Sequence, residues 1–315
     1  MIPMTLSRRN FGRVALAGAA MAGAASSPQC SLSAESEPLT DLIDAHVHLW
    51  TPDTTMYPLS PNFKKADMQP PSFTAEELFA HCRPAGVARI VLIQMSFYEY
   101  DHSYMLEAMK KHQGVFSGVA LIDYQADDVT DQMEALAAQG VRGFRLHSRG
   151  TAKDWVDDPG MARLWRKAAD AGWAVCPLIN PTDITYVDAL CSKFPDTKVV
   201  VDHFARIGIS GTIDSGQLDQ LCRLSRFSNT HVKTSAFYAL GNKSVPYDDL
   251  IPMIRRVVDS FGPERLMWAS DCPFQVQGNH DYVSSIALIR DRIDFLSASD
   301  KQWMLRGTAE KVFFS

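Results

Sequence analysis

From residue 41 onward, short apolar runs alternate with stretches whose apolar residues recur at helical spacing. The apolar runs are rich in β-forming residues and are bounded by turn-forming residues, which predicts strands. Eight such runs lie at residues 41–49, 88–95, 115–122, 141–148, 173–180, 198–205, 231–238 and 265–273.

A helical pattern follows each of these runs. The first begins at Thr74 and has Glu77 at the capping-box position. The fourth begins with Asp158 and Pro159 and ends at Gly172. The eight segments cover residues 74–82, 102–114, 127–140, 157–172, 181–194, 215–227, 247–262 and 280–296.

Strict alternation of strand and helix predicts an α/β fold with a parallel sheet, and eight units are the number that closes a (β/α)8 TIM barrel. A doubly wound open sheet is the alternative. No Gly-rich phosphate loop follows the first strand, which argues against a dinucleotide-binding version of that sheet.

The first 40 residues do not follow this alternation. The sequence Ser7-Arg8-Arg9 resembles the twin-arginine export signal, and an apolar Ala/Gly-rich run at 14–25 follows it. We therefore predict a signal peptide at 1–25, a linker at 26–40 and a single barrel domain at 41–315. The twin-arginine export machinery is then a partner, and the mature protein works in the periplasm.

Composition narrows the range of partners. The chain is 46% hydrophobic and 21% charged, as in ordinary globular proteins, and its net charge of -5 argues against a nucleic-acid partner. After the leader no apolar run is long enough to span a bilayer, so we expect no membrane insertion of the mature chain. The expected partners are a small-molecule substrate and a second copy of the chain in a homodimer.

Polar residues stand at the carboxyl ends of the predicted strands, where barrel enzymes place their chemistry. Along the first strand, Asp44, His46 and His48 alternate and should share one face. One strand histidine is often a structural residue, but polar groups at the same end of many strands predict one pocket. The later strands contribute Gln94, Arg145, His147, Asn180, His203, Arg206 and Asp271.

Three segments carry a family resemblance. "IDAHVHLW", "VVVDHFAR" and "RLMWASDCPF" resemble the His-x-His, sixth-strand histidine and eighth-strand aspartate motifs of the amidohydrolase superfamily. "YPL" and the ending "GTAEKVF" are similar to its amidohydrolase-related branch, which includes lactone hydrolases and non-oxidative decarboxylases. The resemblance covers residues 41–315 and implies that His46, His48, His203 and Asp271 form the catalytic set.

At one position this chain departs from the family pattern. Family members with a full metal site have a histidine at the end of the fifth strand, where this chain reads "CPLIN" and ends in Asn180. The fourth strand offers Arg145 and His147 instead of a lysine or glutamate. This pattern resembles the dicarboxylate lactonases, in which arginines hold an anionic substrate and no metal is required.

Hydrolysis of a lactone fits these residues. Asp271 is the candidate base that takes a proton from water. His46, His48 and His203 could stabilise the carbonyl oxygen, directly or through one zinc or manganese ion held by His46, His48 and Asp271. Arg145 is the candidate anchor for a substrate carboxylate. The further substrate-binding candidates are His147, Tyr57, Asn180, Arg206 and Gln94.

Two other functions are compatible with the same residues. One is non-oxidative decarboxylation of a small carboxylic acid with a divalent metal at His46, His48, His203 and Asp271, against which the missing fifth-strand histidine argues. The other is a catalytically inactive barrel that binds a periplasmic solute.

Overall fold

The computed structural model describes residues 40–150 and 152–315. The predicted signal peptide and all but the last residue of the predicted linker lie outside this range. Among the described residues, no helix combines the length and the hydropathy that crossing a bilayer requires.

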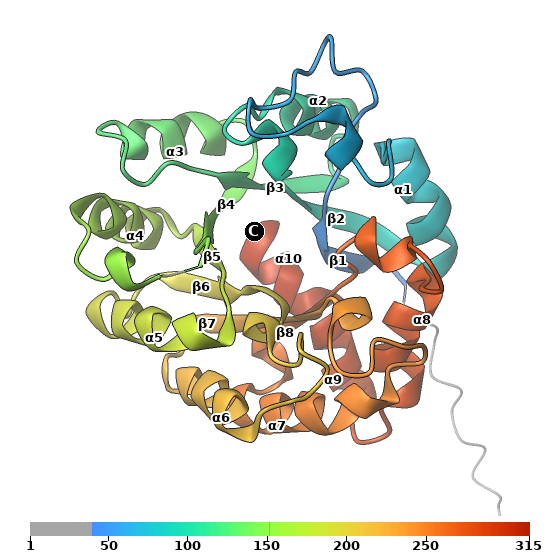
Figure 1. The fold of residues 1–315 in the computed structure, drawn as a ribbon. Helices are drawn as coiled ribbons and strands as arrows, with labels where there is room; N and C mark the ends of the chain where they lie inside the picture. The colour runs from blue at the N-terminus through green and yellow to red at the C-terminus, as the bar shows by residue number, and fades with distance from the viewer. Residues whose placement is uncertain (1–39, 151) are drawn as a thin grey trace, which may run out of the picture. The chain divides into compact units, whose positions relative to one another are not determined.

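Eight parallel strands form one sheet whose order in space is their order in sequence, with helices around it (Figure 1). This is a single-domain TIM barrel, as the alternation predicts. The strands are β1 Leu42–Val47, β2 Val87–Ile93, β3 Phe116–Leu121, β4 Val141–His147, β5 Ala174–Leu178, β6 Lys198–Val201, β7 Thr230–Ser235 and β8 Leu266–Ala269.

Within residues 40–150 and 152–315, the predicted helical segments contain the first eight α-helices, and two more follow near the end. The helices are α1 Ala75–Cys82, α2 Ser103–Lys111, α3 Val129–Ala137, α4 Pro159–Ala171, α5 Ile184–Lys193, α6 Ser215–Arg223, α7 Ile251–Phe261, α8 Tyr282–Ala287, α9 Ala298–Gln302 and α10 Thr308–Phe313. Asp158 caps α4 as its position predicts, because its side chain accepts a hydrogen bond from the Met161 amide.

The ring of strands closes where β8 meets β1. A single bridge joins Val47 to Cys272, and the amide of His48 donates to the carbonyl of Cys272 at 2.8 Å. The amide of Asp271 donates to the carbonyl of His46 at 2.9 Å. The backbone groups of the predicted catalytic residues His46, His48 and Asp271 therefore take part in closing the ring.

The last helix lies at the centre of the ring (Figure 1). Phe313 of α10 is buried among inward-facing side chains such as Ile43 and Val119. The hydroxyl of Ser117, near the start of β3, donates to the Phe313 carbonyl at 2.7 Å. Helix α10 thus fills the amino-terminal end of the barrel and leaves the carboxyl ends of the strands for the site.

The first strand departs from simple alternation. The register of β1 against β2 shifts between Asp44 and Val47, as in a β-bulge. Asp44 therefore does not share the face of His46, and that part of the prediction is wrong. Its carboxylate accepts hydrogen bonds from the Ser270 amide at 2.9 Å and from the Tyr282 hydroxyl of α8 at 2.7 Å.

Candidate active site

The two histidines of β1 meet at the carboxyl end of the barrel. Their Nε2 atoms lie 3.2 Å apart, and both rings are buried. The Nδ1 atom of His48 lies 3.0 Å from the Ile93 carbonyl. Because this carbonyl can only accept, His48 carries a proton on Nδ1.

Asp271 follows β8 and faces both histidines. Its Oδ1 atom lies 3.4 Å from Nε2 of His46 and 3.5 Å from Nε2 of His48, and its Oδ2 atom accepts from the Tyr238 hydroxyl at 2.7 Å. Burial opposes its ionisation, but the neighbouring histidines, His203 above all, outweigh burial and hold the pKa of Asp271 below its usual range. The residue is therefore a carboxylate at neutral pH.

His203 comes from a left-handed turn directly after β6. His203, Phe204 and Ala205 all have φ near +50°, and Arg206 has φ +62°, a conformation that costs about 1–2 kcal/mol per residue. The turn brings Nε2 of His203 to 3.8 Å from Oδ2 of Asp271. The Nδ1 atom of His203 lies 2.8 Å from the Ser235 hydroxyl. Such strain is typical of functional sites.

A cavity of about 300 Å³ opens above this cluster. Arg145 and His147 of β4 line it together with Arg206, and so do His48, His203 and Asp271. Partial burial, and then the guanidinium groups of Arg145 and Arg206, lower the pKa of His147 to about 4. The cavity therefore combines one carboxylate with two guanidinium groups. Met95, Leu178, Ile209 and Phe274 add apolar surface.

Three predicted substrate-binding residues are not in the lining. Tyr57 donates its hydroxyl hydrogen to Glu107 on α2. Gln94 donates to the backbone carbonyls of Glu99 and Asp101 and so fixes the loop after β2. Asn180 accepts a long hydrogen bond of 3.4 Å from Arg206, so its contribution to the cavity is indirect.

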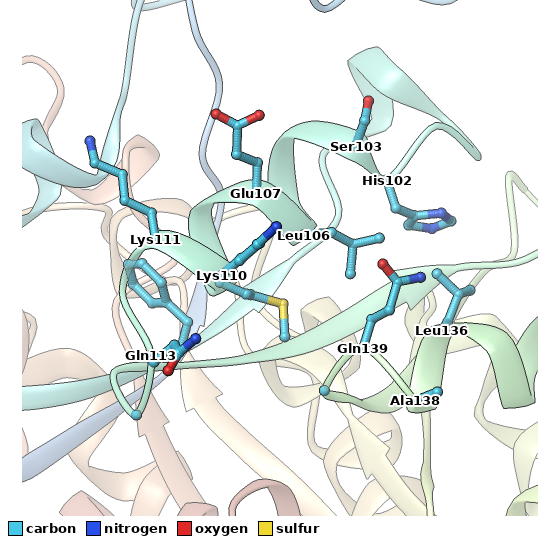
Figure 2. Close-up of a pocket in the computed structure, with 14 residues that line it drawn as sticks. His102, Ser103, Leu106, Glu107, Lys110, Lys111, Gln113, Leu136, Ala138 and Gln139 are labelled. Atoms are coloured by element: carbon cyan, nitrogen blue, oxygen red, sulfur yellow. The ribbon is translucent and has the colours of Figure 1, made fainter.

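A larger hollow lies elsewhere on the barrel. It measures about 1220 Å³ and lies on the outside, beside α2 and the segment after α3 (Figure 2). Its described lining includes Glu107, Lys110, Leu136 and Gln139 and none of the predicted catalytic residues. The larger hollow is therefore not the candidate active site, because its lining lacks the predicted catalytic residues that line the smaller cavity.

Comparison with known proteins agrees with this geometry. The amidohydrolase family model matches residues 43–314. The chain belongs to the amidohydrolase family. The resemblance inferred from its motifs is thereby confirmed.

Two curated members of this family match most of the chain. An L-fucono-1,5-lactonase from Burkholderia ambifaria is 27% identical over 287 residues, which cover 86% of this chain and 94% of that protein. A 2-pyrone-4,6-dicarboxylate hydrolase from Comamonas testosteroni is 28% identical over 240 residues, which cover 73% of this chain and 76% of that protein. The chain is thus a hydrolase of the amidohydrolase family, as its motifs predict.

A solved amidohydrolase has the same fold. The structure of an amidohydrolase from Burkholderia multivorans with bound zinc superimposes with a TM-score of 0.74 at 19% identity, over 87% of this chain and 99% of that one. At this identity the likeness shows the fold alone.

The donor atoms of this amidohydrolase meet the distances that one divalent metal ion requires. One nitrogen each of His46 and His48 and one oxygen of Asp271 lie within 4.8 Å of one another, and all three residues are buried. His46, Asp202 and His203 form a second such group. Imidazole nitrogen and carboxylate oxygen are ordinary zinc ligands. A bound ion would acidify a water molecule.

Two charged residues of the site have no role in the sequence analysis. Asp202 and Lys233 are fully buried, and Nζ of Lys233 lies 3.0 Å from Oδ1 of Asp202. Nε of Arg145 lies 3.4 Å from the other oxygen, Oδ2. A lysine within a predicted strand of the barrel is the available signal, because a buried charge needs a partner. Its partner could be found only from the structure.

Proposed function

We propose that this hydrolase opens a lactone or related cyclic ester of an anionic small molecule, with Asp271 as general base. The names of the two curated relatives support this substrate class, because one is a sugar lactonase and the other acts on a pyrone dicarboxylate. The observation that carries the proposal is the placement of one ionised carboxylate at a cavity lined by two guanidinium groups.

Asp271 has the surroundings that this role requires. Its Oδ2 atom is held by the Tyr238 hydroxyl, so the carboxylate has one orientation. A water molecule between the carboxylate and a bound ester would lose its proton to Asp271 as its oxygen attacks the carbonyl carbon. The C–O bond of the ring then breaks, and the ring oxygen takes the proton back from Asp271 and leaves as the hydroxyl of the product acid.

Arg145 and Arg206 supply the positive charge. The carbonyl oxygen becomes negative during attack and is stabilised by preorganised donors. A guanidinium also binds a substrate carboxylate through two hydrogen bonds. Arg145, the carboxylate anchor expected from the sequence, is buried and paired with Asp202, whereas Arg206 is more exposed. We therefore assign the substrate carboxylate to Arg206 and His147 at the mouth instead.

Replacing Asp271 by Asn tests the proposal. A panel of anionic and neutral lactones should show hydrolysis by the wild type, with a preference for the anionic members. Asp271→Asn should lower kcat by about 10³-fold, because it removes the proton acceptor and keeps the shape. Asp259→Asn, an exposed aspartate on α7, should be unaffected.

Turnover by Asp271→Asn at the wild-type rate would refute the role of Asp271 as general base. Lack of hydrolysis on the whole panel, together with tight binding of one lactone, would favour a solute-binding barrel.

The proposal includes export to the periplasm by the twin-arginine route, supported by Arg8 and Arg9. Arg8→Lys with Arg9→Lys should leave the enzyme in the cytoplasmic fraction, whereas the wild type should be found in the periplasmic fraction. Fractionation followed by immunoblotting measures this. Periplasmic recovery of the double variant would refute this route. The homodimer stays a prediction.

A further inference from the structure

Lys233 is fully buried near the middle of the barrel, and the proposed reaction does not use it. Its Nζ atom lies 3.0 Å from Oδ1 of Asp202 and 3.1 Å from Nδ1 of His46. The centre of the Phe313 ring lies 5.7 Å from the same Nζ atom. Asp202 therefore balances its charge, and His46 receives one of its three N–H groups.

The contact with Lys233 determines which nitrogen of His46 carries the proton. An ammonium group has three donors and no acceptor, so Nδ1 of His46 must accept. In a neutral imidazole the proton is then on Nε2. Oδ1 of Asp202 lies 3.4 Å from Nδ1 of His46 and only 3.0 Å from Nζ of Lys233. This carboxylate oxygen therefore accepts from the ammonium group and not from His46.

The hydrogen bond of His48 supports the same placement of protons. Nδ1 of His48 donates to the Ile93 carbonyl, which leaves a lone pair on Nε2 of His48. The two Nε2 atoms are 3.2 Å apart, so the Nε2 hydrogen of His46 points to an acceptor. Hydrogen bonds thus run in one direction from Lys233 through His46 and His48 to Ile93.

We propose that Lys233, balanced by Asp202, is a positioning residue that holds His46 as its Nε2-protonated tautomer, so that the Nε2 hydrogen of His46 is directed at Nε2 of His48. His46 then has no free lone pair on Nε2. A metal ion at His46, His48 and Asp271 would have to move that proton to Nδ1, where Lys233 already donates. Lys233 thereby weakens metal binding at a donor set whose distances are suitable.

The tautomer itself can be observed in the metal-free wild type. Protein labelled with ¹⁵N in its histidine rings should show His46 protonated on Nε2 and His48 protonated on Nδ1 in two-bond nitrogen–proton spectra. The signals are assigned by their loss in His46→Gln and His48→Gln. A His46 protonated on Nδ1, or on both nitrogens, would overturn the proposal.

Lys233→Met tests the cause. Methionine keeps much of the apolar stem and removes the donor, so Oδ1 of Asp202 becomes free to accept from Nδ1 of His46. We expect His46 to change tautomer and zinc to bind about 10- to 100-fold more tightly, as when a metal-bound histidine gains a carboxylate partner. Competition with a chromophoric chelator measures the affinity.

Lys198→Met is the matched control. This lysine lies at the start of β6, and its Nζ donates to the Gly172 carbonyl, away from the site. It should retain the wild-type tautomer and zinc affinity. If Lys233→Met folds and changes neither, Lys233 is not the positioning residue. If it does not fold, the wild-type spectrum decides alone. Neither measurement depends on the proposed lactone substrate.

Discussion

Burial lowers the pKa values of several histidines, among them His46, His203 and His231. Burial, the largest cause in each case, lowers the pKa of His46 well below its ordinary value and the pKa values of His203 and His231 to about 4. His46 and His203 belong to the site. His231 lies at the start of β7, and its Nδ1 atom is 3.1 Å from the Asn229 carbonyl. The same physical effect therefore acts on stability away from the chemistry.

His231→Gln should reduce the loss of stability in acid. Between pH 6.5 and 4 the unfolded chain binds a proton at this residue and the folded chain does not, so the contribution is present above pH 6.5 and is lost as pH falls. From pH 7 to 4.5 the free energy of unfolding should fall by about 2 kcal/mol less in the variant.

Denaturant unfolding at the two pH values measures this difference. His81→Gln, at an exposed position on α1, serves as the control and should behave as the wild type. An equal fall in wild type and His231→Gln would contradict the assignment.

Site residues at the carboxyl ends of strands could be predicted from the sequence. Residues that reach the site only through a tertiary contact could not. His48, His203 and Asp271 were found from their positions at strand ends, and all three line the cavity. Tyr57 is a predicted substrate-binding residue, but its hydroxyl contacts Glu107 on α2, whereas Tyr238 contacts Asp271. Nothing local in the sequence distinguishes the two tyrosines.

At the scale of elements, the eight strand–helix units were predictable because hydrophobic period and turn residues are local signals. The error at Asp44 arose from the same rule, since strict alternation of faces does not hold through the register shift in β1. That irregularity directs Asp44 outward to α8 while His46 points inward. The first turns of helices show a second limit of prediction from sequence. Two helices can begin with similar residues and yet pack against different neighbouring atoms.

Gly160→Ala and Gly216→Ala form a matched pair. Each glycine is the second residue of a helix capped by an aspartate, in α4 and α6. A Cβ atom at Gly160 would lie 2.0 Å from the Tyr124 carbonyl oxygen, whereas at Gly216 the nearest atom is a side-chain oxygen at 3.3 Å. We expect Gly160→Ala to lose about 1–3 kcal/mol of unfolding free energy.

Gly216→Ala should be neutral or gain up to about 1 kcal/mol through helix propensity. Chemical denaturation compares the two variants. Equal stability of both would show that the loop at Tyr124 yields to the added methyl group.

At the scale of the whole barrel, α10 completes the core that the strands begin. Phe313 is 1% exposed and packs among inward-facing residues of the strands. Its ring centre also lies 5.7 Å from Nζ of Lys233, so the side chain that fills the amino-terminal end of the barrel lies beside the buried polar network.

Phe313→Ala should cost about 3–5 kcal/mol, as expected for a large buried aromatic residue. Phe314→Ala should cost clearly less, because this ring is only partly buried beneath the Arg89 guanidinium. Thermal and denaturant unfolding test the pair. Similar losses for the two variants would contradict the role given to Phe313.

The joint between β8 and β1 links catalysis to the integrity of the ring. Between these strands the Asp271 amide donates a hydrogen bond to the His46 carbonyl, and a single β-bridge pairs Val47 with Cys272. Separation of these two strands would move the base away from the histidine pair without unwinding any helix. Activity should therefore decline early during heating, while the far-ultraviolet circular dichroism of the helices is still intact.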